Sequence, residues 1–182
     1  MKVFAYCCAS FEDITKRAAG VAPLCSPPFT VYNLDLALLE NHDLLWFDLH
    51  GAPGESYWLG DDRTLAMTAT ELRKANLDGA VVFALNCYLA DEDSPMMDAL
   101  LDAGARYIIG GDGKNWAGSK RALMGAGLLG LWFRRLLAWG IPPLKALSLA
   151  KKRVEWSMID KAGKRLAAKD TLQFRAYYRE VT

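Results

Sequence analysis

Two apolar runs that do not alternate place the strongest limit on how this chain can fold. They are 44–49 (LLWFDL), in which five of six residues are apolar, and 79–86 (GAVVFALN). A strand with one face in water alternates apolar and polar side chains, whereas an uninterrupted run is typical of a parallel strand covered on both faces. We therefore expect an α/β protein in three α/β/α layers, with a mostly parallel central sheet and helices on both faces.

The rest of the chain alternates strand-like and helix-like segments in the way that such a fold requires. Ser94 and Pro95 predict one helix start, Thr68 or Thr70 with Glu71 predicts another, and Gly20 and Gly104 follow the ends of helices. Further strands are expected over 2–8, 30–34, 105–111 and, at a sheet edge, 172–178. Helices are expected over 11–20, 36–42, 68–75, 94–104, 119–139 and 142–168, and a small hairpin over 56–67.

Length and composition limit the classes of function. The 182 residues are enough for one domain, which we expect to span 1–182, and they can bury a core without disulfides or metal. A net charge of +1 gives no basic footprint for nucleic acid. The longest apolar stretch, 122–133, is too short to cross a bilayer and is followed by two arginines, so no membrane partner is expected.

Cysteine and histidine usage predicts neither a metal site nor a cofactor. The four cysteines form no CxxC pair and the chain has only two histidines, so a zinc site is not expected. The opening residues lack the pattern of a signal peptide. Cysteines without a signal peptide favour a reducing, cytoplasmic location.

Chemically capable side chains follow the buried strands. His50 and Gly51 come directly after the run 44–49, Cys87 follows 79–86, and Asp112 follows the strand that ends at Gly111. In open parallel sheets the working residues lie beyond the carboxyl ends of the strands. Adjacent strands lie about 4.8 Å apart, so a thiol and an imidazole on neighbouring strand ends can share a substrate.

This pairing suits nucleophilic catalysis. The thiolate is the reactive form of cysteine, and an imidazole can take the thiol proton and later protonate a leaving amine. A glycine beside the histidine lets the backbone approach a substrate carbonyl. The N–H groups of Gly51 and Cys87 are therefore candidates for an oxyanion hole.

Structural explanations exist for each of these residues. Cys87 is also compatible with a purely structural role as a small, buried apolar residue, and His50 followed by glycine is compatible with a simple turn. Cys7 and Cys8 are expected to pack in the first strand, facing opposite sides. Cys25 receives no role, and the other histidine, His42, is expected on the solvated surface.

The sequence was also considered as a nucleotide-binding α/β domain. The stretch 113–120 (GKNWAGSK) has glycines at phosphate-loop spacing, but serine precedes the final lysine, which reverses the required order. No glycine-rich turn follows the first strand, where the sequence reads YCCASFED. We therefore discount this alternative.

The motifs taken together resemble the CHAT family of caspase-like (clan CD) cysteine peptidases, over about 42–155. The order of motifs carries the resemblance: a strand ending in His-Gly, a hairpin, a strand ending near a cysteine, a GAR turn into a strand, and a long RRL helix pair. In this chain they read LLWFDLHG, YWLGDDRTLAMTATELRKANLDGAVVFALNCYLAD, MMDALLDAGARYIIGG and LGLWFRRLLAWGIPPLKALSLAKKRV. The chain departs from the family pattern at Leu85 and Asn86 before Cys87, at Tyr88 after it, and at Trp116, which is not directly after its strand.

The resemblance implies a caspase-like fold and a catalytic dyad of His50 and Cys87, with Gly51 in the oxyanion hole. It implies hydrolysis of peptide bonds through a thioester, with a protein or peptide substrate and an activating partner protein. Acidic residues suggest a preference for cleavage after Arg or Lys: Asp112 is the candidate, and 91–93 are better explained as a solvated loop. The alternative is an inactive CHAT-like scaffold that binds a partner.

Overall fold

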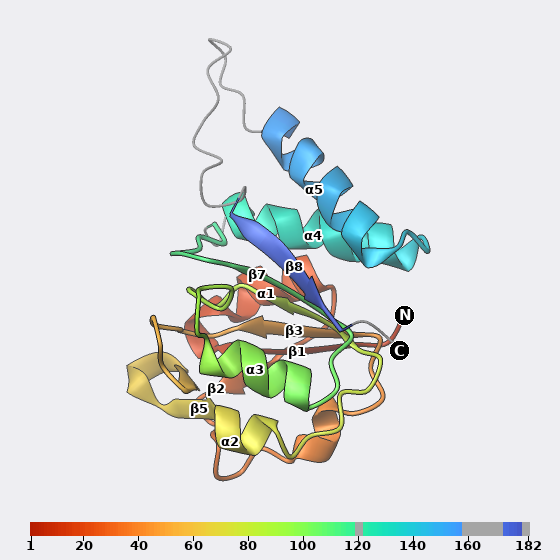
Figure 1. Ribbon diagram of the computed structural model, residues 1–182. Coiled ribbons are helices and arrows are strands. Elements are labelled where there is room, and N and C mark those ends of the chain that lie inside the picture. Colours follow the sequence, from red (N-terminus) through yellow and green to blue (C-terminus); the bar gives the residue numbers. More distant parts are fainter. Residues whose placement is uncertain (119–121, 158–172, 180–182) are drawn as a thin grey trace.

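The central sheet has six strands, five of them parallel. The computed structural model describes residues 1–118, 122–157 and 173–179. The strand order is β2-β1-β3-β6-β7-β8, and only β8, at the edge beside β7, is antiparallel (Figure 1). The strands are β1 (Val3–Cys8), β2 (Leu24–Ser26), β3 (Leu44–Asp48), β6 (Val81–Ala84), β7 (Tyr107–Gly111) and β8 (Phe174–Tyr178).

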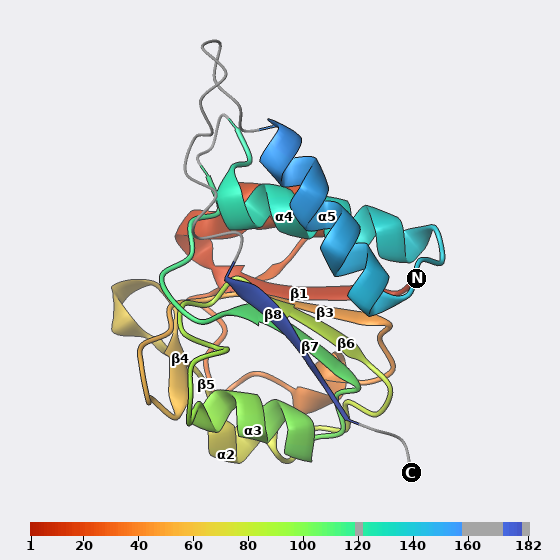
Figure 2. The same cartoon turned by 45° about the horizontal axis from the view of Figure 1, so that its top comes forward.

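Helices cover both faces of this sheet, and a hairpin lies at one end. Figures 1 and 2 show α4 and α5 with α1 over one face, and α2 with α3 over the other. The helices are α1 (Glu12–Ala19), α2 (Ala69–Leu72), α3 (Pro95–Asp102), α4 (Gly125–Ala138) and α5 (Pro143–Ser157). A separate two-stranded sheet pairs β4 (Tyr57–Leu59) with β5 (Leu65–Thr68). The three-layer α/β/α prediction is confirmed, and no helix in the described ranges is long and apolar enough to cross a membrane.

The double cover explains why the run 44–49 does not alternate. All five residues of β3 are buried, so its side chains enter two separate cores. On the α4 face, Trp46 stacks on Phe83 with ring centroids 4.8 Å apart, and Phe83 stacks on Phe133 of α4 at 5.2 Å. Gly130 faces this stack: a Cβ there would lie 2.2 Å from the Trp46 ring.

Replacement of Gly130 by alanine is expected to destabilise the fold, although alanine is the better helix former. The added methyl would collide with two packed rings, Trp46 and Phe83. Overpacking of this kind costs about 1–3 kcal/mol and exceeds the propensity gain of about 1 kcal/mol. Urea denaturation measures the difference, and a variant as stable as the original chain would show that the rings can shift freely.

Most of the expected elements are confirmed, including two helix starts. The hydroxyl groups of Thr68 and Ser94 accept the backbone N–H of Glu71 and Met97, respectively, and the left-handed Gly20 ends α1. The helix expected over 36–42 is a short 3-10 turn, Leu36–Leu39. The long helix begins at Gly125 rather than at 119, while 119–121 and 158–172 lie outside the described residues.

Two expectations were wrong. The second strand lies at Leu24–Ser26, inside the expected proline-rich loop, and 30–34 form a turn instead. The segment 24–26 becomes a strand because it pairs in parallel with β1, with Cys7 opposite Cys25. Sequence periodicity does not reveal this pairing. His42 is half-buried against the Phe4 ring at 5.7 Å rather than solvated.

Candidate active site

A cavity of about 190 Å³ lies beyond the carboxyl ends of β3 and β6. His50 and Cys87 both line it, as the sequence predicts for neighbouring strand ends. The other lining residues come from α1 and the turn before it, the ends of β3 and β6, and the loop after β7: Phe11, Ile14, Asp48, Leu49, Leu85, Asn115, Trp116, Ala117 and Gly118. The fold thus brings the imidazole and the thiol to one small concave site.

The hairpin holds the backbone of His50. Its N–H donates to the carbonyl of Leu59 at 2.8 Å, and the N–H of Leu59 donates back to the His50 carbonyl at 3.0 Å. The imidazole lies edge-on to the Phe11 ring at 5.3 Å, and about half of the side chain is exposed. The main chain is therefore fixed while the ring remains accessible from the cavity.

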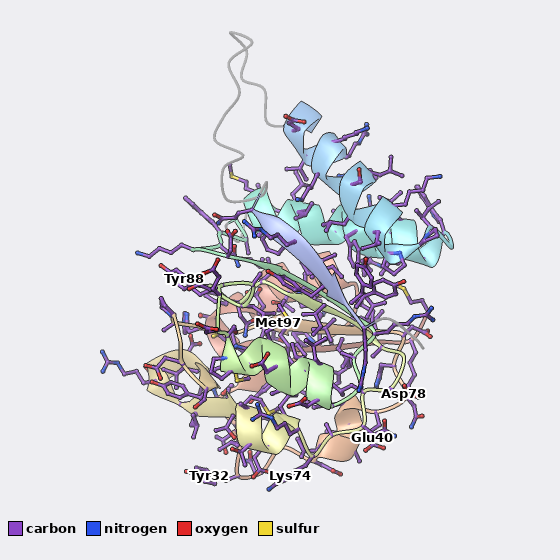
Figure 3. The ribbon with its side chains drawn as sticks, in the orientation of Figure 1. Tyr32, Glu40, Lys74, Asp78, Tyr88 and Met97 are labelled. Carbon is purple, nitrogen blue, oxygen red and sulfur yellow. The ribbon has the colours of Figure 1, made fainter. Side chains whose placement is uncertain are left out.

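Cys87 is held from the opposite side by the loop after β7. The backbone N–H of Asn115 donates to Cys87 Sγ at 3.3 Å. The next residue, Tyr88, has a left-handed backbone (φ 61°), and its N–H donates to the carbonyl of Gly113 at 2.9 Å. Figure 3 shows Tyr88 on the side of the molecule away from Asp78. A non-glycine residue in this conformation is strained, and strain of this kind concentrates at functional sites.

Gly51 lies directly against the backbone of Cys87. A Cβ at Gly51 would be 2.3 Å from the Cys87 carbonyl oxygen and 3.5 Å from its nitrogen. Within the described part of the chain, neither the N–H of Gly51 nor that of Cys87 donates a hydrogen bond. Only glycine allows the two segments to approach this closely.

Two asparagines tie the strand ends together. Asn86 Oδ1 accepts the backbone N–H of Leu49 at 3.0 Å, which links the loop before His50 to the residue before Cys87. The side-chain amide of Asn115 donates to the carbonyls of Leu85 and Asn86 at 3.1 and 2.9 Å. Asn86 was a departure from the family pattern in the sequence, and here it sets the spacing between the histidine and cysteine segments.

A buried carboxyl group forms part of the cavity wall. Asp48 is 4% exposed, and the Thr15 hydroxyl donates to its Oδ2 at 2.8 Å. Burial raises the pKa of Asp48 to about 7, and the Thr15 hydrogen bond opposes that rise only in part. Near neutral pH, Asp48 is therefore present in both its protonated and its ionised form.

Ionisation of Asp48 is expected to make folding stability fall as pH rises from about 4 to about 7. The folded chain binds this proton more tightly than the unfolded chain, so unfolding releases it in that range. The loss is on the order of 2–4 kcal/mol, and Asp48→Asn should remove it. Urea denaturation of both proteins at pH 5 and pH 8 measures the effect, and parallel changes in the two would contradict it.

A second cysteine lies beside the histidine on the side of the hairpin. Cys8 Sγ, an imidazole nitrogen of His50 and a carboxylate oxygen of Asp61 all lie within 4.8 Å of one another. Burial raises the pKa of the Cys8 thiol to about 12, and the negative charge of Asp61 acts in the same direction. Cys8 is therefore a protonated thiol at neutral pH and a poor nucleophile.

Asp112, predicted to bind a basic substrate residue, lies beside the loop but does not line the cavity. Its carboxylate forms an ion pair with Arg175 of β8 at 2.8 Å. The acidic loop 91–93 is half-buried to exposed, as expected of a solvated loop.

Sequence reasoning did not identify Asp48, Asp61 and Asn115 as neighbours of the site. Asp48 was within reach of that reasoning, because it is the one charged residue inside an otherwise apolar buried strand. Asp61 belongs to the expected hairpin turn and Asn115 to the loop after β7, and no local pattern directs either toward His50 or Cys87.

Comparison with known proteins supports the fold. Neither any family model nor any curated protein matches the sequence, so the CHAT family itself is not shown. Among solved structures, the Arg specific cysteine proteinase gingipain R aligns with a TM-score of 0.61 and 13% identity over 96% of this chain. The Saccharomyces cerevisiae separase–securin complex aligns with a TM-score of 0.52 and 12% identity over 85% of this chain. The chain spans 45% of the gingipain chain and 10% of the separase chain, and the fold it shares with them is caspase-like.

Proposed function

We propose that this chain is a caspase-like cysteine endopeptidase with His50 and Cys87 as its catalytic dyad. The observation that carries the proposal is the shared cavity: a solvent-accessible imidazole and a thiol line it from adjacent parallel strands. The caspase-like fold shared with gingipain R supports it. On this proposal 1–182 form a single peptidase domain acting on protein or peptide substrates.

The reaction follows from the roles of these groups. His50 accepts the thiol proton, and the Cys87 sulfur attacks the substrate carbonyl carbon. The resulting oxyanion is stabilised by the N–H groups of Gly51 and Cys87, which have no acceptor among the described residues. His50 then protonates the departing amine as the C–N bond breaks, leaving a thioester, and water hydrolyses the thioester to release the acid and regenerate the thiol.

A peptide probe with a thiol-reactive group tests the nucleophile. An acyloxymethyl ketone peptide is expected to attach covalently to Cys87, as read by mass spectrometry of the digested protein. Cys25, which is also half-buried, is the internal control and should stay unmodified. A folded chain that remains unlabelled at Cys87 would favour the alternative, an inactive scaffold that binds a partner protein.

The proposed preference for Arg or Lys before the cut depends on Asp112. Asp112 lies outside the cavity lining and its carboxylate is paired with Arg175 at 2.8 Å, so a basic substrate residue has to replace Arg175 as its partner. We expect Arg and Lys peptides to be cleaved fastest and Asp112→Asn to reduce that preference. A matched set of peptides with Arg, Lys, Asn or Asp before the scissile bond measures it, and equal cleavage of all four would contradict it.

A further inference from the structure

The cluster of Cys8, His50 and Asp61 has the dimensions of a metal site. Its three ligand atoms lie within 4.8 Å of one another, and His50 Nε2 is 4.0 Å from Asp61 Oδ1. Around a tetrahedral zinc ion, with bonds of about 2.0–2.3 Å, ligand atoms are about 3.3–3.6 Å apart. Small rotations of exposed side chains are enough to close the difference.

The surrounding residues hold these ligands in position. The carbonyl of Leu59, at the end of β4, accepts a hydrogen bond from the backbone N–H of His50 at 2.8 Å. The protonated Cys8 thiol donates to the same oxygen at 3.6 Å, a bond that ends when the thiol loses its proton. The carboxylate of Asp61 accepts two hydrogen bonds from Ser10, from the backbone N–H at 2.6 Å and from the hydroxyl at 2.7 Å. Hydrogen-bonded support of this kind orients the ligands of natural metal sites.

The ligand types and their exposure identify the class of ion. Sulfur, imidazole and carboxylate together suit Zn²⁺ or Co²⁺, whereas Mg²⁺ and Ca²⁺ prefer oxygen ligands alone. Cys8 is buried, but the side chains of His50 and Asp61 are 53% and 24% exposed. The cluster is therefore open on the solvent side, where a water molecule can complete a tetrahedron.

We propose that Cys8, His50 and Asp61 form a binding site for one zinc ion, which inhibits the enzyme by occupying the catalytic imidazole. Zinc binding replaces the S–H bond of Cys8 with a Zn–S bond and releases the proton to solvent. The imidazole then donates its lone pair to the metal and cannot accept the thiol proton of Cys87. The inhibition rests on the proposed peptidase function, whereas the metal site itself does not.

Cobalt titration tests the site without any measure of activity, because Co²⁺ bound by a thiolate absorbs in the near ultraviolet. The unmodified chain should develop this band, and zinc should abolish it. Cys87→Ala should keep the band and Cys8→Ser should lose it. Cys7→Ser is the matched control, since Cys7 is equally buried in the same strand and is not one of the three ligands.

Two further variants test the same site if the Cys8→Ser chain does not fold. Asp61→Asn removes a partly exposed ligand and should weaken cobalt binding. Ser10→Ala removes one hydrogen bond from that ligand and should weaken it on the order of 10–100-fold. The absence of a band in the unmodified chain, or a band lost in Cys87→Ala and kept in Cys8→Ser, would overturn the proposed site.

Peptide hydrolysis with and without zinc tests the inhibition, with each variant compared with its own metal-free rate. Zinc should slow the unmodified chain strongly and the Asp61→Asn chain much less. A cobalt band in a chain that cleaves no peptide would refute the peptidase and retain the site. Peptide cleavage without any cobalt band would refute the metal site and leave the proposed peptidase function standing.

Discussion

Replacement of Cys87 by alanine is expected to reduce kcat/KM for peptide hydrolysis by roughly 10³-fold or more, because Cys87 carries the only thiol that lines the cavity among the described residues. Cys8 is close to His50 but cannot substitute, since burial keeps its thiol protonated. The structure supports a clean test: Cys87 is only partly buried, so removal of its sulfur should leave the core intact. Initial rates on a fluorogenic peptide measure the loss, and circular dichroism verifies folding.

The same experiment on His50 tests whether the two residues act as a pair. His50→Ala should cause a loss of similar size, and the double variant should be little worse than either single one, because a dyad functions only as a unit. Cys25→Ala is the control with an unchanged rate. Losses that multiply in the double variant would contradict a shared catalytic role.

Replacement of Gly51 by alanine is expected to lower kcat by about 100-fold or more while the chain stays folded. The new methyl would collide with the Cys87 carbonyl oxygen at 2.3 Å, and a backbone atom cannot rotate away as a side chain can. Cys87 or the Gly51 N–H must therefore move. Displacements near 1 Å at a reacting centre cost about 10²-fold in rate.

Gly54 supplies the matched control for that prediction. It lies in the same loop, and a Cβ there would meet nothing within 4 Å, although its φ of 69° imposes a strain of about 1–2 kcal/mol. Gly54→Ala should therefore lower thermal stability slightly and leave the hydrolysis rate within a few-fold. Equal losses of activity in the two variants would show that loop strain, and not contact with Cys87, controls the rate.

Local sequence patterns predicted most of the elements and the two central site residues. Thr68 and Ser94 start helices through side-chain bonds to residues three positions ahead, which is information contained within one turn. The apolar runs predicted strands covered on both faces, and that topology predicted the neighbouring ends at which His50 and Cys87 line one cavity. These features are short-range, or they follow from a general rule about parallel sheets.

Other features depended on which segments meet across long stretches of chain. No local pattern distinguishes 24–26 from 30–34 as the strand beside β1, because that choice depends on pairing across the sheet. Asp112 offered an acidic group at the right strand end, but β8 brings Arg175 to it from 63 positions away. The partner of a charged group is fixed by packing, which no local pattern records.

The sequence by itself thus determined the layered α/β fold and placed a histidine and a cysteine at one edge of its sheet. Uninterrupted apolar runs indicate strands buried on both faces, and such strands belong to parallel sheets covered by helices on both sides. Only the tertiary structure decided what surrounds them. It folds the hairpin back so that Asp61 and Cys8 meet His50, and it sets Asn115 on Cys87. Such contacts join loops whose paths depend on the packing of the whole chain, and they determine the surroundings of His50 and Cys87.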